Sequence, residues 1–384
     1  MRSTAGNPQV AAGSAAVAAV SVQETEAEPL IKVRDLTVEF RTQSLVRAVH
    51  GISYAMAAGE HVGLVGESGS GKSASALALV RLLPRTATVS GSVELAGREL
   101  MTLSESELRE VRGGQVGIVY QDPFSSLNPV LTIGRQITEV LTRHKGMRGD
   151  EARTEAARLL DGVGVPNAVD RLADYPHQFS GGMRQRTIIA MAISPEPSVL
   201  IADEPTTALD VTVQAQILEL LQSLTEQHHM AMLLITHDLG VIAGITQRVM
   251  VMYAGRIVES ATTEDLFNRA SHPYTVALHQ SLPRIDKRQE RLPTIQGHPP
   301  DLRRAIRGCP FAPRCPRRIE RCKNEDPPLM SVEIARQAAS PEWTLKRIKE
   351  EGGEQAPGPE SPHLTACWNP PPPSSSVADG WEPT

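Results

Sequence analysis

The chain has 384 residues, a formal net charge of -5, 40% hydrophobic residues and 22% charged residues. These fractions are those of ordinary globular proteins, which excludes wholesale disorder, and the length predicts two or three domains. The sequence contains no run of 18 or more apolar residues, so it predicts no membrane-spanning helix. All four cysteines lie after residue 308, and four are too few for the disulfide framework of a secreted protein.

The two ends of the chain differ in composition from the rest. Residues 1–29 are small and polar, and we expect a disordered tail there. A signal peptide with its core at 10–20 is the weaker alternative, because that stretch consists of Ala, Gly, Ser and Val. At the other end, Pro370–Pro373 opens a second expected disordered tail, 370–384.

Short apolar runs alternate with amphipathic segments from Leu30 to about residue 250. This alternation predicts an α/β fold with a parallel sheet covered on both faces. Buried strands are expected at His61–Gly66, Val116–Gln121, Val199–Asp203 and Met230–Thr236. Helices are expected at Ser73–Leu83 and Val211–His229, and an antiparallel hairpin at Arg248–Tyr253 and Arg256–Ser260.

The strongest motif follows the first of these strands. The residues Gly66, Glu67, Ser68, Gly69, Ser70, Gly71, Lys72 and Ser73 fit the P-loop pattern G-x-x-x-x-G-K-[ST]. Its glycines let the backbone curl so that N–H groups point at phosphate oxygens, and the next helix adds the positive end of its dipole. The pattern assigns Lys72 to the β- and γ-phosphates and Ser73 to Mg²⁺.

Further polar residues follow the later strands. The strand at 199–203 ends in Asp203 and Glu204, which suit a Mg²⁺ holder and a base for an attacking water; capping of the next helix is the bland alternative. Gln121 and His237 each end an expected strand. Ser180, Gly181 and Gly182 open an apolar helical segment and form a second candidate anion site. Each of these residues is a weak signal alone, and it is their order after the P-loop that indicates a shared function.

In this order the chain resembles the nucleotide-binding subunits of ABC transporters, over residues 30–265. The matching segments are the Walker A motif (66–73), Q-loop glutamine Gln121, signature (179–186), Walker B (198–204), D-loop (208–210) and switch His237. The resemblance implies a P-loop NTPase (RecA-like) core with an antiparallel β subdomain and a helical subdomain at about 122–185. The signature reads Phe-Ser-Gly-Gly-Met where the family usually has Leu-Ser-Gly-Gly-Gln, but its phosphate-contacting residues are retained.

The resemblance also implies roles for individual residues. Glu204, His237 and Gln121 would be catalytic, and Ser73, Gln121 and Asp203 would hold Mg²⁺. The P-loop residues would bind ATP, while Ser180–Gly182 would contact an ATP held by a second ATPase subunit. Phe40, near the end of the first strand, is the candidate for stacking on adenine; a plain core role is the alternative.

The four cysteines need a separate explanation. Cys309, Cys315, Cys322 and Cys367 lie in a segment that holds most of the prolines, 18 of 29 beyond residue 282. Long helices and regular sheets are therefore not expected there. Four thiolates are a ligand set for Zn²⁺ or an iron–sulfur cluster, although the paired C-x2-C knuckles of zinc ribbons are absent. Unrelated free thiols are the third alternative.

Three patterns narrow the resemblance. His-Pro-Tyr-Thr at 272–275, Ile-x-Gly-x-x-Pro-x-Leu at 295–302 and Cys-Pro-Phe-Ala-Pro-Arg-Cys at 309–315 look like the C-terminal extension of oligopeptide/dipeptide ABC importers, a group that includes nickel importers. In that group four cysteines can hold a [4Fe-4S] cluster, which we place ahead of Zn²⁺ or no metal. The extension is expected at 266–369.

The resemblance implies an ATPase that energises import of short peptides, with ATP and Mg²⁺ as cofactors. Its expected partners are a second ATPase subunit, two transmembrane permease subunits and an extracytoplasmic substrate-binding protein; no nucleic acid is expected. Its expected location is the cytoplasmic face of the membrane. The alternatives are import of nickel or another small solute, and a soluble ABC ATPase outside transport. The cysteines could also act as a redox sensor.

Overall fold

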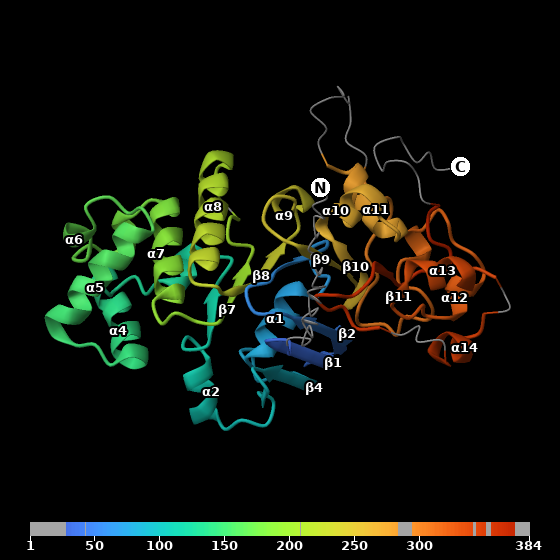
Figure 1. The fold of residues 1–384 in the computed structure, drawn as a ribbon, viewed down its shortest axis with the longest axis horizontal. Helices are drawn as coiled ribbons and strands as arrows, with labels where there is room; N and C mark the ends of the chain where they lie inside the picture. Colours follow the sequence, from blue (N-terminus) through green and yellow to red (C-terminus); the bar gives the residue numbers. More distant parts are fainter. Residues whose placement is uncertain are drawn as a thin grey trace, which may run out of the picture.

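The computed structural model describes residues 28–42, 44–207, 209–282, 294–340, 343–350 and 355–372. The tails expected at 1–29 and 370–384 fall almost wholly outside these ranges, as does Ala208 of the D-loop. Two sheets and a set of helices build the described part, and Figure 1 shows the strands in the middle of the molecule with helices towards both ends of its long axis.

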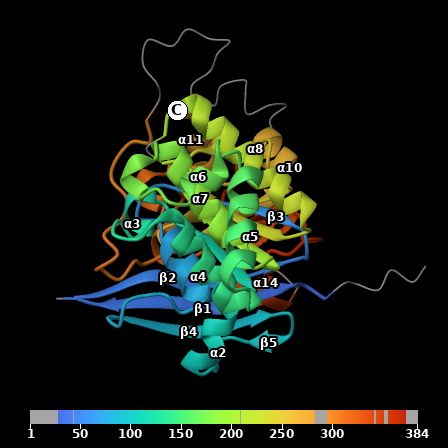
Figure 2. The ribbon, with the colours of Figure 1, turned by 90° about the vertical axis from the view of Figure 1, so that its left-hand side faces the viewer.

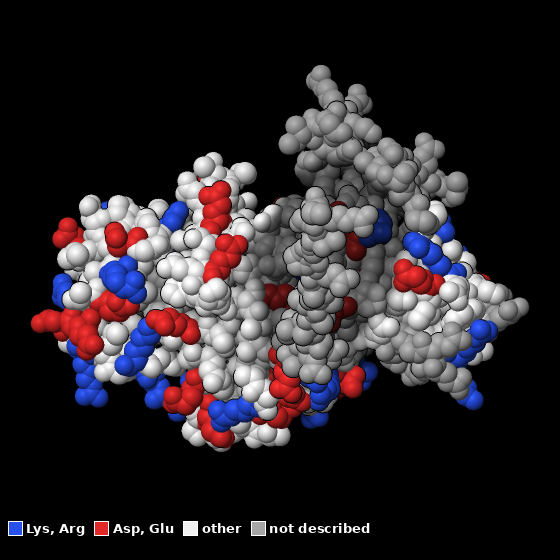
Figure 3. Space-filling view, viewed as in Figure 1, with Lys and Arg blue, Asp and Glu red and all other residues white. Residues whose placement is uncertain are grey.

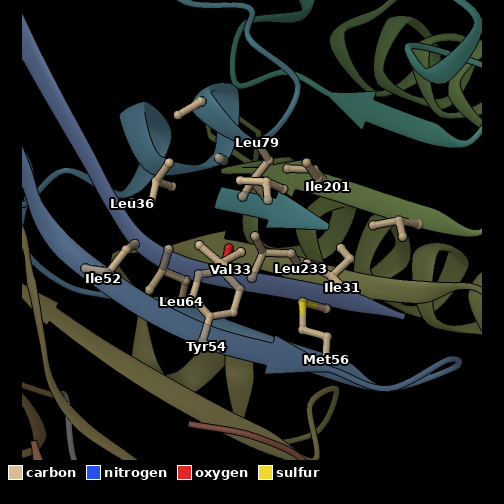
Figure 4. Packing of buried hydrophobic residues seen from close by; sticks show 14 of the residues in the cluster. Ile31, Val33, Leu36, Ile52, Tyr54, Met56, Leu64, Leu79, Ile201 and Leu233 are labelled. Atoms are coloured by element: carbon tan, nitrogen blue, oxygen red, sulfur yellow. The ribbon is translucent and has the colours of Figure 1, made fainter. Parts of the chain in front are cut away.

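The smaller sheet is antiparallel and runs in the order β2-β1-β4-β5. Its strands are β1 (Ile31–Arg41), β2 (Leu45–Met56), β4 (Ala87–Leu95) and β5 (Arg98–Glu99). Apolar side chains of β1 such as Ile31 and Val33 are buried while Arg34 and Asp35 are exposed, as expected of a sheet with one wet face. Figure 4 shows this face packing on Leu79 of the first helix and on Ile201 and Leu233 of the other sheet.

The larger sheet runs in the order β11-β12-β10-β9-β3-β8-β7-β6. Its strands are β3 (His61–Val65), β6 (Val116–Val119), β7 (Val199–Asp203), β8 (Ala231–Thr236), β9 (Arg248–Tyr253), β10 (Arg256–Thr262), β11 (Met330–Ser331) and β12 (Leu364–Thr365). β6, β7, β8, β3 and β9 are mutually parallel, so their carboxyl ends meet at one edge. The expected strands and hairpin all form, although β6 ends two residues before Gln121.

Helices lie between many of the strands along the chain, as the alternating pattern predicts. They are α1 (Lys72–Leu79), α2 (Glu105–Val111), α3 (Pro123–Ser126), α4 (Ile133–Lys145), α5 (Gly149–Gly162), α6 (Ala168–Arg171), α7 (Gly181–Ile193), α8 (Val211–Gln227), α9 (Leu239–Ile242), α10 (Thr263–Arg269), α11 (Pro273–Gln280), α12 (Arg321–Asn324), α13 (Val332–Ala338) and α14 (Leu345–Glu350). α1 ends before the expected Leu83, because Arg81 adopts a left-handed conformation and Pro84 follows.

Helices α4 to α7 form a lobe beside the sheet, seen at the left of Figure 1 and facing the viewer in Figure 2. Ile133, Ile137 and Leu141 on one face of α4 are buried against α5 and α7, in the same apolar cluster as Ile217 and Leu221 of α8. The 3.6-residue spacing of these side chains accounts for the helices. On the face in Figure 3, charges of both signs are interspersed over this lobe.

The C-terminal segment continues the larger sheet. β12 pairs antiparallel with β10, β11 pairs with β12, and the backbone N–H of Ala366 donates to the carbonyl of Val258. Regular sheet was not expected here, and the two added strands are only two residues long. They form because the edge of β10 has unpaired backbone groups that a neighbouring strand can satisfy.

A buried polar network joins this segment to β10. Glu259, which is fully buried, accepts hydrogen bonds from the backbone N–H groups of Ser271 and His272, and its Oε1 lies 2.6 Å from Nε2 of His363. His272 caps α11 through Nδ1, which accepts from the N–H of Tyr274 at 3.1 Å. Burial lowers the pKa of His272 to about 4, although the Glu259 carboxylate and a hydrogen bond to the backbone of Ala366 oppose the shift.

Acid should therefore destabilise the fold through His272. A histidine that is neutral when folded takes up a proton when unfolded, so stability is present above pH 6.5 and is lost as the pH falls toward 4. From pH 7 to pH 5 we expect His272 to remove about 2 kcal/mol. Urea unfolding should show a smaller loss in His272→Asn, which retains a capping oxygen. His228→Asn, at an exposed histidine, should keep the wild-type loss; equal losses in both variants would contradict the assignment.

Within the described residues, no helix is both long enough and apolar enough to cross a membrane.

Candidate functional site

The phosphate loop lies between β3 and α1, at the edge where the parallel strands end. A Cβ atom on Gly66 would lie 2.1 Å from the carbonyl oxygen of Met252, and one on Gly71 would lie 2.4 Å from that of Ala48. Gly71 also has a φ of +104°, which disfavours any side chain. Packing against β2 and β9 therefore requires glycine at both ends of the loop.

Lys72 points back along this loop. Its Nζ donates to the carbonyl oxygen of Gly66 at 2.7 Å and to that of Glu67 at 3.1 Å. Burial lowers the pKa of Lys72, whereas the carboxylates of Glu204, Asp203 and Glu67 raise it. An anion bound beside the ammonium group would offset its burial, as the phosphates of a nucleotide do.

Asp203 and Ser73 meet beside Lys72. The Ser73 hydroxyl donates to Oδ1 of Asp203 at 3.0 Å, although the two residues come from α1 and β7. Burial raises the pKa of Asp203, and the nearby Glu204 carboxylate adds to the rise. A hydroxyl and a carboxylate are hard oxygen donors, the type Mg²⁺ prefers, and a divalent cation would offset the burial of Asp203. The residues present therefore fit Mg²⁺.

Glu204 is held from several sides. Its backbone has a φ of +46°, and its N–H donates to the carbonyl oxygen of Ile235 on β8. Gln121 Nε2 donates to Oε2 at 2.8 Å, the Thr207 hydroxyl donates to the same oxygen at 3.0 Å, and His237 Nδ1 lies 3.3 Å from Oε1. Residues that follow β6, β7 and β8 thus converge on one carboxylate.

These groups surround a cleft of about 700 Å³. It is lined by Ala48, Glu67, Ser68, Gly69, Gly71, Lys72, Ser73, Ala74, Gln121, Glu204, Thr207, His237 and Leu278. Gly66 and Ser70 do not line it: the carbonyl oxygen of Gly66 accepts from Lys72 Nζ, and Ser70 is buried. The structure therefore places the loop, the strand-end acid and both strand-end polar residues around one space.

Phe40 and the signature residues lie elsewhere. Phe40 is half-buried, packs against the apolar cluster shared by the two sheets and does not line the cleft. Ser180 caps α7, with its hydroxyl accepting from the N–H of Met183 at 3.3 Å. A Cβ on Gly181 would meet Leu209 and one on Gly182 would meet Val213, so the signature start lies against the beginning of α8. It is not among the residues that line the cleft.

Sequence reasoning missed several residues of this site, including one beside Glu204 and two on α11. Thr207 bonds to Glu204, Leu278 lines the cleft, and Tyr274 accepts the N–H of Glu67 at 2.8 Å. Thr207 lies three residues after Glu204, and that short distance was the only available signal. Leu278 and Tyr274 lie on α11, more than two hundred residues from the loop, where no local pattern points to it.

The four cysteines are free thiols, and the charges of the other three each tend to raise the pKa of Cys367. Burial is the largest cause for each shift, and it raises the pKa of Cys309 to about 12 and that of Cys315 to about 11. Within the described residues no group of three or more His, Cys, Asp or Glu side chains is arranged to hold a metal ion. The predicted iron–sulfur or zinc centre is therefore not supported, because metal ligation requires thiolates in ligand geometry.

Comparison with known proteins matches both the ATPase part of the chain and its C-terminal part to transporter families. A family described as "ABC transporter" matches residues 49–207, and one described as "Oligopeptide/dipeptide transporter, C-terminal region" matches residues 258–322. The oligopeptide transport ATP-binding protein OppD of Salmonella typhimurium is 50% identical over 302 residues, 78% of this chain and 90% of that protein. Its Escherichia coli counterpart is 48% identical over 311 residues, 81% and 92% of the two chains.

Solved structures show a similar fold. An ATP-binding cassette in a dimeric post-hydrolysis state, bound to ADP and Pi, is 28% identical and superposes with a TM-score of 0.55. The match covers 61% of this chain and 98% of that one. The two family matches and the relatives are consistent with the phosphate loop at 66–73 and with the acids Asp203 and Glu204 at the end of β7. The chain therefore belongs to the ATP-binding subunits of oligopeptide ABC transporters and is an ABC-type ATPase.

Proposed function

We propose that this chain hydrolyses ATP to power the import of oligopeptides through a membrane complex. The observation that carries the proposal is the convergence on Glu204 of Gln121, Thr207 and His237 at the mouth of a phosphate-loop cleft. The printed names of its relatives, oligopeptide transport ATP-binding proteins, supply the solute class.

The proposed chemistry is attack of water on the γ-phosphate of ATP. The N–H groups of residues 68–73 and the Lys72 ammonium bind the phosphate chain. Glu204 orients the water and accepts its proton, and the bond between the β- and γ-phosphates breaks to release ADP and phosphate. His237, which is exposed at the rim, contacts the γ-phosphate, while Gln121 holds the Glu204 carboxylate in place.

Mg²⁺ is the proposed metal cofactor at this site. Ser73 and Asp203 would hold it, because their oxygens already meet at 3.0 Å beside the loop, and Gln121 is the further ligand proposed at the rim. When bound, Mg²⁺ neutralises charge on the phosphates as they are transferred.

A second ATPase subunit is proposed to complete the site. The cleft of this chain contains the phosphate loop but not Ser180–Gly182. The start of α7 offers backbone N–H groups at a helix N-terminus, which suits a phosphate held by another subunit. The solved relatives are dimeric ATP-binding cassettes, which supports this arrangement. Phe40 stays a proposal for adenine stacking, and its packing in the core supports the alternative.

The two permease subunits are proposed to dock on the helical lobe. Val130, in the loop between α3 and α4, is 76% exposed, so an apolar side chain is available there for a contact. Next to it lies a groove of about 850 Å³ lined in part by Ser126, Asn128 and Leu131. This placement supports 123–131 as the main contact. The proposed location, the cytoplasmic face of the membrane, rests on the oligopeptide transport relatives. An extracytoplasmic binding protein would supply the solute.

The division of the chain is likewise proposed as an ATPase domain, 30–265, with a helical subdomain at about 122–185, and an extension at 266–369. The helices α3 to α7 support the subdomain. The pairing of β12 with β10 means that the extension packs as part of the same sheet.

ATP turnover by the assembled transporter tests the function. The chain is co-expressed with the other subunits and placed in liposomes, and ATP hydrolysis is measured with the binding protein and a mixture of short peptides. Stimulation by peptides with uptake of the peptide supports the proposal. Stimulation by Ni²⁺ alone would favour a nickel importer, and co-purification with nucleic acid rather than with permeases would favour a soluble ABC ATPase.

The four cysteines remain proposed ligands of a [4Fe-4S] cluster, with Zn²⁺ as the alternative. The resemblance to peptide importers supports this, whereas the placement of the side chains and the raised pKa values of Cys309, Cys315 and Cys367 do not. Iron, zinc and acid-labile sulfide are measured in full-length protein purified without oxygen. Colourless, metal-free protein would reject the proposal, and equal ATPase rates under oxidising and reducing conditions would argue against a redox sensor.

A further inference from the structure

Arg314, in the cysteine-containing extension, reaches the phosphate loop. Its Nη1 donates to Oε2 of Glu67 at 2.7 Å, and its Nη2 donates to Oε1 at 3.0 Å. The pairing is bidentate, and the Arg314 side chain is only 4% exposed. Charge-assisted pairs of this geometry are among the stronger polar contacts in proteins.

The guanidinium group is fixed in this direction by its remaining donors. Nη1 also reaches the Tyr253 hydroxyl at 3.3 Å, Nη2 donates to the carbonyl oxygen of Ile295 at 3.1 Å, and Nε donates to that of Gln296 at 3.0 Å. Lysine has no planar fork and could not satisfy these partners together. These hydrogen bonds hold the Arg314 guanidinium group in one orientation between the extension and the phosphate loop.

Two further contacts join the extension to the same loop. The Tyr274 hydroxyl accepts the backbone N–H of Glu67 at 2.8 Å. Pro299, Pro300 and Leu302 face residues 67–70 across a cavity of only about 20 Å³. The first turn of the phosphate loop therefore lies between its own strand and the extension.

Glu67 is an unfavourable residue for a site that binds phosphates. Its side chain helps line the ATP cleft, and its charge acts on Lys72, whose pKa it raises. An unpaired carboxylate there would repel the phosphates and compete with them for the Lys72 ammonium. Arg314 neutralises this carboxylate and holds it by both oxygens.

We propose that Arg314 is a positioning residue of the nucleotide site, which holds Glu67 and thereby keeps the phosphate loop in its ATP-binding form. The extension then forms part of the ATP site. This inference depends on the proposed function, because it assumes that the loop binds ATP.

The first test compares the KM for ATP with kcat in the assembled transporter. Arg314→Gln should raise the KM for ATP about tenfold or more and change kcat by less than about twofold. The matched control is Arg317→Gln, because Arg317 lies in the same segment but donates to the backbone oxygen of Asn369 at 3.3 Å within the extension. The control should keep the wild-type KM, and an equal KM in the two variants would overturn the proposal.

The second test uses the partner residue. In Arg314→Gln the KM rises because the Glu67 carboxylate is left unpaired. Adding Glu67→Gln removes that charge and should bring the KM back to within about threefold of wild type. An equal rise in KM in the Glu67→Gln background would overturn the proposal. If Arg314→Gln fails to fold, Arg314→Lys decides: we expect a KM above wild type that Glu67→Gln lowers, and a wild-type KM overturns the proposal.

A measurement on the wild type distinguishes failure of the Arg314 role from failure of the proposed ATPase function. ATP binding by the full-length wild-type chain is measured first by calorimetry. Lack of binding there would reject the function itself. Binding and turnover in the wild type, together with an unchanged KM in Arg314→Gln, would reject only the role of Arg314.

Discussion

Glu204→Gln is expected to leave ATP binding intact and to slow ATP hydrolysis by about a hundredfold or more. The substitution keeps the size of the side chain but removes the oxygen that would accept a proton from water. Gln121 and Thr207 both donate to Glu204 Oε2, so the site is built around a carboxylate that only accepts hydrogen bonds. An amide there turns one accepting position into a donor and cannot act as a base.

The measurement is the kcat for ATP in the assembled transporter, with the Kd for ATP determined on the same preparation. Glu226→Gln is the matched control, because Glu226 is exposed on α8 and accepts from Gln222 at its surface. That variant should behave as wild type. Normal turnover in Glu204→Gln would remove Glu204 from the catalytic role, and loss of ATP binding would assign it to binding.

Lys72→Ala should weaken ATP binding by about a hundredfold and reduce hydrolysis accordingly. The ammonium group donates to the carbonyl oxygens of Gly66 and Glu67, so it also holds the loop closed in the absence of phosphates. Its loss removes the positive charge that the carboxylates of Asp203 and Glu204 act on beside the phosphates. Repulsion then adds to the lost hydrogen bonds.

Calorimetric titration of the full-length chain with Mg-ATP measures this effect. Lys323→Ala is the control, because its ammonium group pairs with Glu320 on the surface of the extension and should not affect the nucleotide. Unchanged affinity in Lys72→Ala would contradict the assignment of residues 66–73 as the phosphate loop. The unfolding temperature without nucleotide, measured for both variants, shows whether the fold survives.

The core of the fold and half of the site could be predicted because their signals are local. A buried parallel strand needs an unbroken apolar run, and β7 and β8 lie at the predicted positions within one residue. Parallel strands in one sheet place their carboxyl ends together. Gln121, Glu204 and His237, each just after a strand, were therefore bound to meet at one edge.

Other features could not be predicted because they depend on contacts between distant segments. The sequence offers Phe40, near the end of β1, for adenine stacking or for a core role, and only the tertiary structure shows that it packs against the apolar cluster shared by the two sheets. The pairing of β12 with β10 was missed for a related reason. Strands of two residues have no periodicity that a sequence pattern can reveal, and they form only because β10 offers an open edge.

The sequence alone indicated a P-loop NTPase with strand-end acids, because glycine, lysine and carboxylates at these spacings suit phosphate chemistry and the geometry of parallel strands. The ABC type followed from the resemblance of the motif order to that family. Only the tertiary structure placed Arg314 against Glu67 and Tyr274 beside the loop. A bidentate ion pair between residues so far apart in the chain leaves no local pattern. The pair forms only because tertiary packing brings the extension against the phosphate loop, where the two side chains meet.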